Sequence, residues 1–554
     1  MKLKCLPFVP ISRRMRFLKI VALLVIVHCN ATVLQSQSYN IILGRPTDTS
    51  ITASILFEQN MQGYLEYGTA SGSYASQTAV ATIVAGTPLE LTVMGLQPNT
   101  NYYYRLKYKT AAAPNYSVSP EYRFHTQRAV GSGFTFTIEA DEHLYDKKGI
   151  ANMYRVTLQN QLADQPDFML SLGDIFGDDH NWPTITSQEL DVLHKNYRPF
   201  LGAVCHSIPF YVCLGNHEGE NDYYYLQNPG ANLCVWGTQW RKHYYPNPYP
   251  NAFYSGNTDL EGYGIGNPEN YYAWTWGDAQ FVVLDVYRDQ CDTSDKPQKW
   301  AWSLGKKQYD WLKTTLESST SKYKFVFAHH VRGQGRGGVT NAPLYEWGGL
   351  VNGRDLFAAN RPGWEKPIHK LFVDNKVNIF FQGHDHVFAH EMLDGVTYQT
   401  CPMPSDSTYR IGMDANADAF VSDTIEGTGH IRVTVGPDGT KVDFVRAYLP
   451  KDTFGVHKNR EVPFSYTVGG NPAAQKRTKL ENVVVKPNPA EDKVTVIFPA
   501  NLGNRRLTLR SATGNKLHIT SQSMVDLSPY SPGVYLLEIE ADGLKTTEKI
   551  LIHR

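Results

Sequence analysis

The chain lacks net charge and lacks a long hydrophobic run. Its 53 lysines and arginines balance 53 aspartates and glutamates, so composition gives no support for a nucleic-acid-binding surface or a polybasic membrane patch. The apolar run at residues 20–31 is too short to span a bilayer comfortably, and it follows a basic stretch at residues 13–19. This order is typical of a secretory signal peptide, which we place at residues 1–37; the alternative is an uncleaved anchor. We expect no transmembrane segment in the mature chain.

Cysteine is also scarce, with seven residues in the chain. Cys5 and Cys29 would leave with the signal peptide. The remaining five are an odd number, so at least one thiol of an exported chain lacks an internal partner. Cys234 and Cys291 lie in polar, loop-like sequence and could form a disulfide. Cys213 stands inside an apolar run and is expected to be a small core residue.

The length of 554 residues predicts about three or four domains. Short β-rich runs separated by turn residues predict a small β-sandwich at residues 39–127. Residues 131–450 alternate strand and helix patterns, which predicts an α/β domain. Residues 451–482 are expected to be a linker, and residues 483–554 a second small β-sandwich. The helical patterns of the central domain lie at residues 149–164, 187–204, 306–318 and 364–375.

Polar residues end five short apolar runs of the central domain. Each run has the character of a buried strand, and ligands gather at the carboxyl ends of strands in sheets with helical crossovers. We therefore expect these side chains to meet at one edge of one sheet. They supply enough imidazole and carboxylate for two metal ions, a common arrangement in phosphate-ester hydrolases. The candidate metal ligands are Asp141, His143, Asp174, Asn216, His329, His384 and His386.

The order of these motifs resembles the calcineurin-like metallophosphoesterase superfamily over most of residues 131–450. The motifs are Asp-x-His (141–143), Gly-Asp (173–174), Gly-Asn-His-Glu (215–218), His-His (329–330) and Gly-His-Asp-His (383–386). The resemblance implies a β-sandwich flanked by helices, in which Asp174 bridges two cations. Asp141, His143 and His386 would complete one site, and Asn216, His329 and His384 the other. His217 would face the leaving group and stabilise or protonate it.

The chemistry that this set supports is hydrolysis. Two cations about 3.5–4 Å apart repel each other, so a shared anionic ligand is needed between them. Imidazole and carboxylate ligands together suit zinc, iron or manganese as divalent or trivalent ions. A water bridging both cations would be hydroxide near neutral pH and would attack phosphorus in line. We expect the catalytic residues to be His217 and Asp174.

The N-terminal module resembles a fibronectin type III module in the stretch LTVMGLQPNTNYYYRLKY. A sandwich of this kind before a metallophosphatase domain also resembles purple acid phosphatases. Those enzymes have Val-x-x-His where this chain has Val326 to His329, so His329 is preferred over His330 as the ligand. They also have a tyrosine three residues after the bridging aspartate. Here that position is Gly177, so a purple Fe(III)–tyrosinate centre is not expected.

The C-terminal module resembles the sorting domain of the type IX secretion system. The resemblance rests on the head at residues 486–490 (KPNPA), the turn at 531–533 (SPG) and the closing strand at 549–552 (KILI). It implies a Gram-negative bacterium of the Bacteroidota type, the type IX secretion machinery as a partner, and a product that is secreted or held on the cell surface. The module itself would be removed at the outer membrane.

Other residues are candidates for contact with substrate. Arg332 and Arg336 follow the His-His motif and could clamp a phosphate. Asp178, Asp179 and His180 could orient metal-bound histidines or form a polar loop. The insertion at residues 221–257 could line a cleft with aromatic rings, although core packing is the simpler role for Tyr223, Tyr224, Trp236 and Trp240.

The resulting hypothesis is a secreted binuclear-metal phosphoesterase acting on phosphomonoesters or phosphodiesters. One alternative is a hydrolase of pyrophosphates or nucleotides. The other is a non-catalytic surface binding protein with a vestigial metal fold, against which the complete ligand set argues.

Overall fold

The structure is a computed structural model of the chain. It describes residues 39–289, 299–331, 335–411, 419–420, 424–455, 457–469, 483–498, 505–511, 515–541 and 544–554. The chain divides into two compact units, one ending at Val468 and one beginning at Gly469. Within the described ranges, no helix is both long enough and apolar enough to cross a bilayer.

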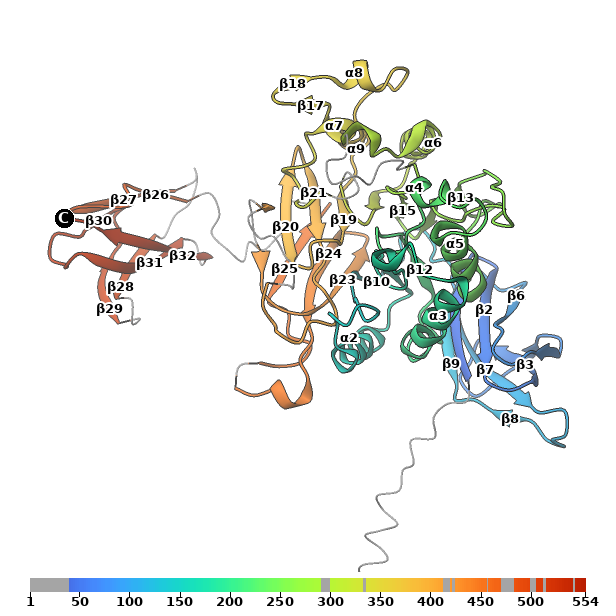
Figure 1. Ribbon diagram of the computed structural model, residues 1–554. Coiled ribbons are helices and arrows are strands. Elements are labelled where there is room, and N and C mark those ends of the chain that lie inside the picture. Colours follow the sequence, from blue (N-terminus) through green and yellow to red (C-terminus); the bar gives the residue numbers. More distant parts are fainter. Residues whose placement is uncertain are drawn as a thin grey trace, which may run out of the picture. The chain divides into compact units, whose positions relative to one another are not determined.

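A β-sandwich opens the first unit, as the turn-punctuated sequence predicts (Figure 1). One sheet contains β1 (Tyr39–Gly44), β2 (Ser50–Phe57) and β6 (Leu89–Met94). The other is built on the pair β3 (Met61–Gly68) and β7 (Asn101–Lys109). Shorter strands border that pair, namely β4 (Ser76–Gln77), β5 (Ala81–Ile83), β8 (Ser117–Val118) and β9 (Tyr122–His125).

This sandwich is packed firmly against the central domain. Arg198 of the central domain is fully buried and donates hydrogen bonds to Asn40 Oδ1 at 2.6 Å and to the carbonyl oxygen of Ser54 at 3.0 Å. The hydroxyl of Tyr104 donates to the carbonyl oxygen of His206 at 2.6 Å. The N-terminal module and the central domain accordingly belong to the same compact unit.

The central domain contains two sheets, so the expectation of one sheet from the strand ends is wrong, whereas the β-sandwich implied by the family resemblance is confirmed. The first sheet has the order β12-β11-β10-β23-β24-β25, and β10, β11 and β12 are parallel. The second has the order β13-β14-β15-β16-β19-β21-β20-β22, in which β15, β16, β19 and β21 are parallel. A buried apolar strand gives no sign of which of two stacked sheets it joins, and this is why the sequence did not separate them.

The strands of the first sheet are β10 (Phe134–Glu139), β11 (Phe168–Ser171), β12 (Phe210–Val212), β23 (Gly429–Gly436), β24 (Gly439–Arg446) and β25 (Phe464–Val468). Those of the second are β13 (Ser255–Gly256), β14 (Tyr272–Trp276), β15 (Ala279–Val283), β16 (Tyr323–Phe327), β19 (Ile379–Gln382), β20 (Phe388–Leu393), β21 (Val396–Thr400) and β22 (Thr424–Ile425).

Aromatic side chains fill the space between the two sheets. Phe136 and Phe168 of the first sheet contact Phe281 of the second, with ring centroids 5.1 and 5.2 Å apart. Phe327 and Phe381 stack at 5.1 Å within the same core. Aromatic pairs at these distances stabilise a core beyond the area that they bury. The sheets are therefore held face to face, as in a sandwich.

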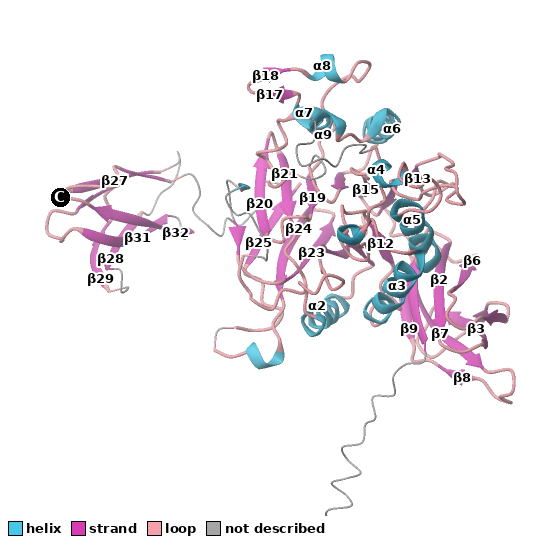
Figure 2. Cartoon of the chain, in the orientation of Figure 1, coloured by secondary structure: helices cyan, strands magenta, loops and turns pink. Residues whose placement is uncertain are grey.

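Helices cover the outer faces of this sandwich (Figure 2). The four predicted helices all form: α2 (Ala151–Asp164) and α3 (Ser187–Gly202) by the first sheet, and α6 (Gly305–Glu317) and α9 (Ile368–Asp374) by the second. Thr186 and Glu189 form a capping box that fixes the start of α3. The remaining elements are α4 (Asp222–Tyr225), α5 (Leu233–Tyr244), α7 (Tyr345–Gly348), α8 (Phe357–Asn360), β17 (Leu350–Val351) and β18 (Arg354–Asp355).

The expected linker at residues 451–482 is shorter than predicted. Residues 464–468 form β25, which pairs with β24 as an edge strand of the first sheet. Residues 470–482 lie outside the described residues. The sequence FSYTV of β25 is only half-buried, so its apolar pattern is weak.

The second unit is a small β-sandwich. One sheet has the order β26-β27-β30 and the other β29-β28-β31-β32. Leu507, Leu537 and Ile539 are among the side chains buried between them. The strands are β26 (Val484–Lys486), β27 (Lys493–Ile497), β28 (Arg506–Ser511), β29 (Lys516–Thr520), β30 (Met524–Asp526), β31 (Gly533–Ala541) and β32 (Leu544–Ile552).

The cysteines of the described ranges are buried thiols, namely Cys205, Cys213, Cys234 and Cys401. Cys213 is fully buried in the core, as expected. Cys291 lies outside the described residues, so its pairing with Cys234 stays a prediction.

Candidate metal centre

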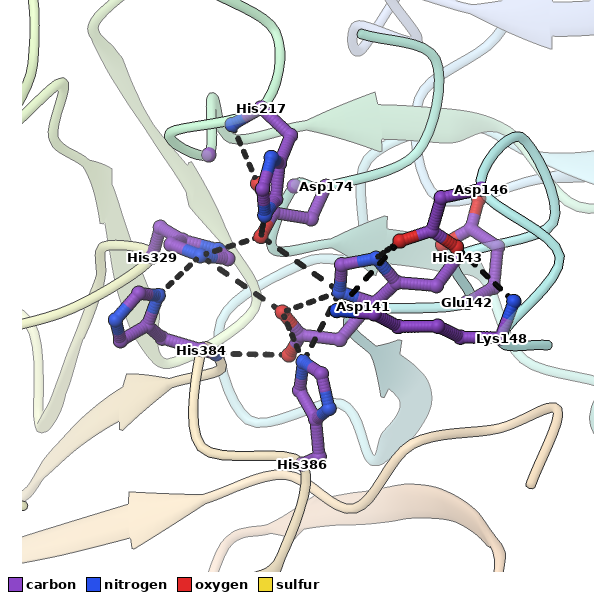
Figure 3. Close-up of polar contacts among 12 residues, drawn as sticks. Asp141, Glu142, His143, Asp146, Lys148, Asp174, His217, His329, His384 and His386 are labelled. Atoms are coloured by element: carbon purple, nitrogen blue, oxygen red, sulfur yellow. Dashed lines mark hydrogen bonds and ion pairs between the residues drawn. The ribbon is translucent and has the colours of Figure 1, made fainter. Parts of the chain in front are cut away.

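Five strands from the two sheets end at one place. The loops after β10, β11 and β12 carry Asp141 and His143, Asp174, and Asn216. The loops after β16 and β19 carry His329, His384 and His386. Figure 3 shows the histidine and aspartate side chains of this set pointing toward a common centre. The structure therefore brings together the carboxyl ends of parallel strands from both sheets.

Asp141, His143 and His386 form one compact group of possible ligands. Asp141 Oδ1 lies 4.0 Å from His143 Nε2 and 3.8 Å from His386 Nε2, and the two Nε2 atoms lie 3.0 Å apart. Nitrogen and oxygen ligands bind a cation such as zinc at about 2.0–2.2 Å, so neighbouring ligand atoms lie roughly 3–4 Å apart. The group thus has the dimensions of one metal site.

Asp174, His329 and His384 form a second group. Asp174 Oδ2 lies 3.2 Å from His329 Nε2, which lies 3.2 Å from His384 Nδ1. The same Oδ2 lies 3.8 Å from His143 Nε2 of the first group. Asp174 therefore stands between the two groups.

Hydrogen bonds distinguish His329 from His330. The Nδ1–H of His329 donates to the carbonyl oxygen of Leu172 at 2.8 Å, so the ring is oriented with Nε2 facing Asp174. His330 Nε2 instead lies 3.1 Å from the carbonyl oxygen of Gly337. The geometry favours His329 as the ligand, in agreement with the sequence register.

Two buried oxygens test whether the site suits a cation. Asp141 Oδ1 and Asn216 Oδ1 have no hydrogen-bond partner among the described residues. Asp141 is fully buried, and 8% of Asn216 is exposed. A buried polar atom without a partner carries a desolvation cost of about 1–3 kcal/mol, which a metal bond removes. The donor set therefore fits a metal centre.

The carboxylates and imidazoles shift one another's pKa values. Burial opposes ionisation of Asp174, but His329 and His217 outweigh it and hold the pKa of Asp174 well below its usual range. Burial raises the pKa of Asp141 to about 6 despite the opposing effect of His329. Burial lowers the pKa of His384 strongly, assisted by the neighbouring imidazoles of His330 and His329. Ionised Asp174 and neutral His384 are the forms that bind a metal.

His217 has a different set of partners. Its Nδ1 lies 2.5 Å from Asp179 Oδ1, and its Nε2 lies 3.7 Å from Asp174 Oδ2. Burial alone would lower the pKa of His217, but Asp174 and Asp179 outweigh it and raise the pKa to about 10. These two carboxylates therefore favour the protonated form of His217, which lies at the border of the centre. The sequence left open whether this loop orients metal-bound histidines or is simply a polar loop. Asp179 contacts His217, which is not one of the expected metal ligands.

Five candidate ligands have left-handed backbone conformations. The φ angles of Asp141, His143, Asp174, His384 and His386 lie between 45° and 69°. Such conformations are uncommon for residues other than glycine and cost about 1–3 kcal/mol when strongly disfavoured. They gather where strands end and side chains must turn toward one point. Backbone strain of this kind is concentrated at functional sites.

Two glycines are required by close packing around Asp174. A Cβ at Gly215 would overlap the carboxylate of Asp174. A Cβ at Gly177 would overlap the carbonyl group of His217. Gly177 occupies the position where purple acid phosphatases have their tyrosine, and a tyrosine there would require the backbone of the Gly-Asn-His-Glu loop to move.

Glu218 holds the turn that carries Asp174. Its carboxylate accepts hydrogen bonds from the backbone N–H groups of Asp174 (3.0 Å), Ile175 (2.7 Å), Phe176 (3.3 Å) and Gly215 (2.7 Å). Only 2% of the residue is exposed. The carboxylate therefore satisfies the backbone donors of two loops at once.

We expect Glu218→Gln to lower the stability of the first unit by about 2–4 kcal/mol, because an amide NH₂ would face backbone N–H groups and leave two donors unpaired. Urea-induced unfolding followed by tryptophan fluorescence measures this change. Glu317→Gln, on the exposed face of α6, is the control and should change stability by less than about 0.5 kcal/mol. Equal midpoints for the two variants would contradict the role of Glu218.

The sequence missed two residues that contact His143. Asp146 Oδ2 and the hydroxyl oxygen of Tyr145 lie 3.2 and 3.1 Å from His143 Nδ1. They orient the ring so that Nε2 faces the centre, as outer partners of metal-binding histidines commonly do. The sequence feature that could have indicated these contacts is the position of the two residues, two and three places after His143.

The predicted substrate contacts are less well placed. Arg336 Nη1 donates to the carbonyl oxygen of His384 at 3.0 Å and lies 3.4 Å from Asp385 Oδ1, so this arginine supports the loop after β19. Arg332 lies outside the described residues. Tyr224 is buried and Tyr223, Trp236 and Trp240 are partly buried in one cluster with Leu190 of α3, so these aromatics pack the insertion against α3.

Comparison with known proteins identifies the central segment. Residues 134–388 match the sequence model of the calcineurin-like phosphoesterase family. These residues form a calcineurin-like phosphoesterase domain. The structure of PhoD is similar, with a TM-score of 0.55 and 17% identity over 77% of this chain and 89% of that one. GAP50, the anchor in the inner membrane complex of Plasmodium, has a TM-score of 0.33 and 13% identity over 60% of this chain and 88% of that one. No curated protein sequence matches the chain.

Residues 484–553 match the secretion system C-terminal sorting domain. The match confirms the interpretation of the second unit as a sorting module of the type IX system. The protein is accordingly secreted or displayed at the cell surface. The calcineurin-like domain is therefore carried outside the cytoplasm with the rest of the chain.

Proposed function

We propose that this protein is a secreted binuclear-metal phosphoesterase that hydrolyses phosphomonoesters or phosphodiesters. The observation that carries the proposal is the position of Asp174 Oδ2, 3.2 Å from His329 Nε2 and 3.8 Å from His143 Nε2, between two groups of metal-binding side chains. Asp141, His143 and His386 would hold one ion, and Asn216, His329 and His384 the other. Asp174 would be shared by both.

The two ions, when bound, would supply a water acidic enough to ionise near neutral pH and positive charge for the phosphate oxygens. The imidazole-rich donor set suits zinc, iron or manganese. The chain's own residues set the geometry. Asp174 would hold both ions, and Asp146 and Tyr145 contact His143 Nδ1 and orient its ring.

His217 would act on the leaving group. Asp179 holds its Nδ1–H, which leaves the Nε2–H free to be donated. An alkoxide or phenoxide that leaves phosphorus takes up a proton or a hydrogen bond from this nitrogen. General acid catalysis of this kind contributes about 10²–10⁴-fold.

The test is hydrolysis of p-nitrophenyl phosphate and bis-p-nitrophenyl phosphate by the purified protein loaded with zinc or manganese. The proposal predicts turnover that is lost on chelation and restored by the metal. The ratio of the two rates distinguishes a monoesterase from a diesterase. Absence of turnover with both sites filled would contradict the proposal for these substrate classes.

Asp179→Asn is expected to move the alkaline limb of the kcat/KM profile to lower pH by about 1–2 units. The Asp179 carboxylate raises the pKa of His217, so its removal lowers that pKa, and the acid form is lost as pH rises through it. Asp178→Asn, one residue earlier in the same loop, is the control and should leave the limb in place. An unchanged limb in Asp179→Asn would exclude this role.

We further propose that the type IX secretion machinery removes the second unit. Protein recovered outside the producing cells should end before Val483, and intact-mass spectrometry measures this. A secreted chain that retains Arg554 would contradict removal.

A further inference from the structure

A further cluster of possible metal ligands lies at the border of the centre and shares His217 with it. Asp179, His180 and His217 each place one ligand atom within 4.8 Å of the other two. Asp179 Oδ1 lies 3.6 Å from His180 Nδ1 and 2.5 Å from His217 Nδ1. The rings of His180 and His217 have centroids 4.5 Å apart and planes 23° apart. His180 has no part in the reaction proposed above.

We propose that Asp179, His180 and His217 form a third metal site, which binds zinc at higher free concentration than the centre does and inhibits hydrolysis. The inhibition rests on the phosphoesterase function proposed above, whereas zinc binding at this site does not. The site would fill only when free zinc exceeds the concentration that fills the centre. Hydrolysis would therefore slow as the zinc concentration around the protein rises.

The donor set suits this ion. Two imidazoles, one carboxylate and a water make the tetrahedral coordination common for zinc. Ligand atoms on one zinc at about 2.1 Å lie about 3.4 Å apart, close to the separation of Asp179 Oδ1 and His180 Nδ1. The 2.5 Å between Asp179 Oδ1 and His217 Nδ1 is a hydrogen-bond distance. It would lengthen when a zinc ion replaces the proton between these two atoms.

Exposure makes this site different from the main centre. Half of the His180 side chain is exposed (52%), with 16% of Asp179 and 15% of His217. By contrast, at most 1% of the side chains of Asp174 and His329 is exposed. An ion from solution therefore reaches the cluster directly, and His180 can turn about its side-chain bonds to complete the site. Weaker, exchangeable binding is expected where ligands are exposed and must be ordered.

Binding at this site would change how His217 is held beside the leaving group. The N–H bond at His217 Nδ1 breaks, a zinc–nitrogen bond forms, and the proton passes to solvent. Bonds to the ion would replace the hydrogen bond between Asp179 Oδ1 and His217 Nδ1, which orients the ring, and would draw Nε2 away from its position 3.7 Å from Asp174 Oδ2. Hydrolysis of substrates that need leaving-group protonation would then be slowed.

The test uses His180→Ala, with His243→Ala as the matched control, since His243 is an exposed imidazole on α5 outside the cluster. Equilibrium dialysis of the full chain against buffered free zinc, with metal counted by plasma mass spectrometry, measures binding. We expect wild type and His243→Ala to take up one more exchangeable zinc than His180→Ala. Equal zinc uptake by all three proteins would overturn the site.

Activity in the same zinc buffers tests inhibition. His180→Ala should need at least about tenfold more free zinc for half-inhibition than the other two proteins, because loss of a direct ligand weakens binding at least as much as loss of an outer partner. Loss of the extra zinc without a change in half-inhibition would overturn the inhibitory role. Were wild type to show no hydrolysis at all, the function would fail, and the dialysis would still decide the site.

Discussion

Asp174→Asn is expected to lower kcat/KM for phosphoesters by at least about 10³-fold. The substitution removes the negative charge that stands between the two ligand groups, so the two ions would repel each other without compensation. Stabilisation by a metal ion is worth several kcal/mol, and about 1.4 kcal/mol corresponds to a factor of ten in rate. Steady-state rates on both p-nitrophenyl substrates, with metal content measured on the same samples, give the answer.

The Asp174→Asn variant should also bind less metal than wild type, because the shared ligand contributes to both sites. Asp178→Asn carries the same change in charge four residues later and should keep both activity and metal content. An Asp174→Asn variant with wild-type turnover and two bound ions would show that Asp174 is not the bridging ligand.

His217→Asn is expected to lower turnover of an alkyl phosphoester by about 10²–10⁴-fold while both metals remain bound. His217 stands outside the two ligand sets proposed for the ions of the centre, although it also lies near His143 and Asp174. The loss should be much smaller for p-nitrophenyl esters, since that leaving group departs without a proton. The measurement is the ratio of rates on the two kinds of substrate.

A uniform loss on both kinds of substrate would contradict the leaving-group role of His217 and would point to a role in binding phosphate. Loss of metal in His217→Asn would instead assign His217 to the ligand set. The two results separate an acid from a ligand at the same position.

The sequence indicated that the candidate ligands would lie together because they follow strand ends. Asp141, Asp174 and His329 each come directly after an apolar run, and the structure places all three at one point. The four central helices were also predicted, since their apolar spacing is distinct. Patterns of this kind are local, and local patterns are what a single sequence records.

Long-range pairing was not predictable in the same way. The strands that lead into Asp174 and His329 lie in different sheets, although both are short and largely buried. The pairing of Asp179 with His217 depends on how two loops meet, and their sequence separation gives no sign of it. The left-handed backbone at Asp141 and His384 is likewise fixed by packing and hydrogen bonds around the centre, not by residue type.

The N-terminal module has a structural consequence that composition did not suggest. A spacer would have few buried contacts with its neighbour, whereas Arg198 is fully buried against this module. The module therefore supports α3, the helix that leads into β12 and the loop of Asn216 and His217. The N-terminal sandwich therefore contributes to the geometry of the site through α3, although it carries none of the candidate ligands.

The central claim is that two ions share Asp174, and anomalous diffraction from metal-loaded crystals tests it most directly. The account predicts two peaks about 3.5–4 Å apart at the absorption edge of the bound metal, one beside Asp141, His143 and His386 and one beside Asn216, His329 and His384, with Asp174 in contact with both. A single peak, or two peaks without Asp174 between them, would contradict the account.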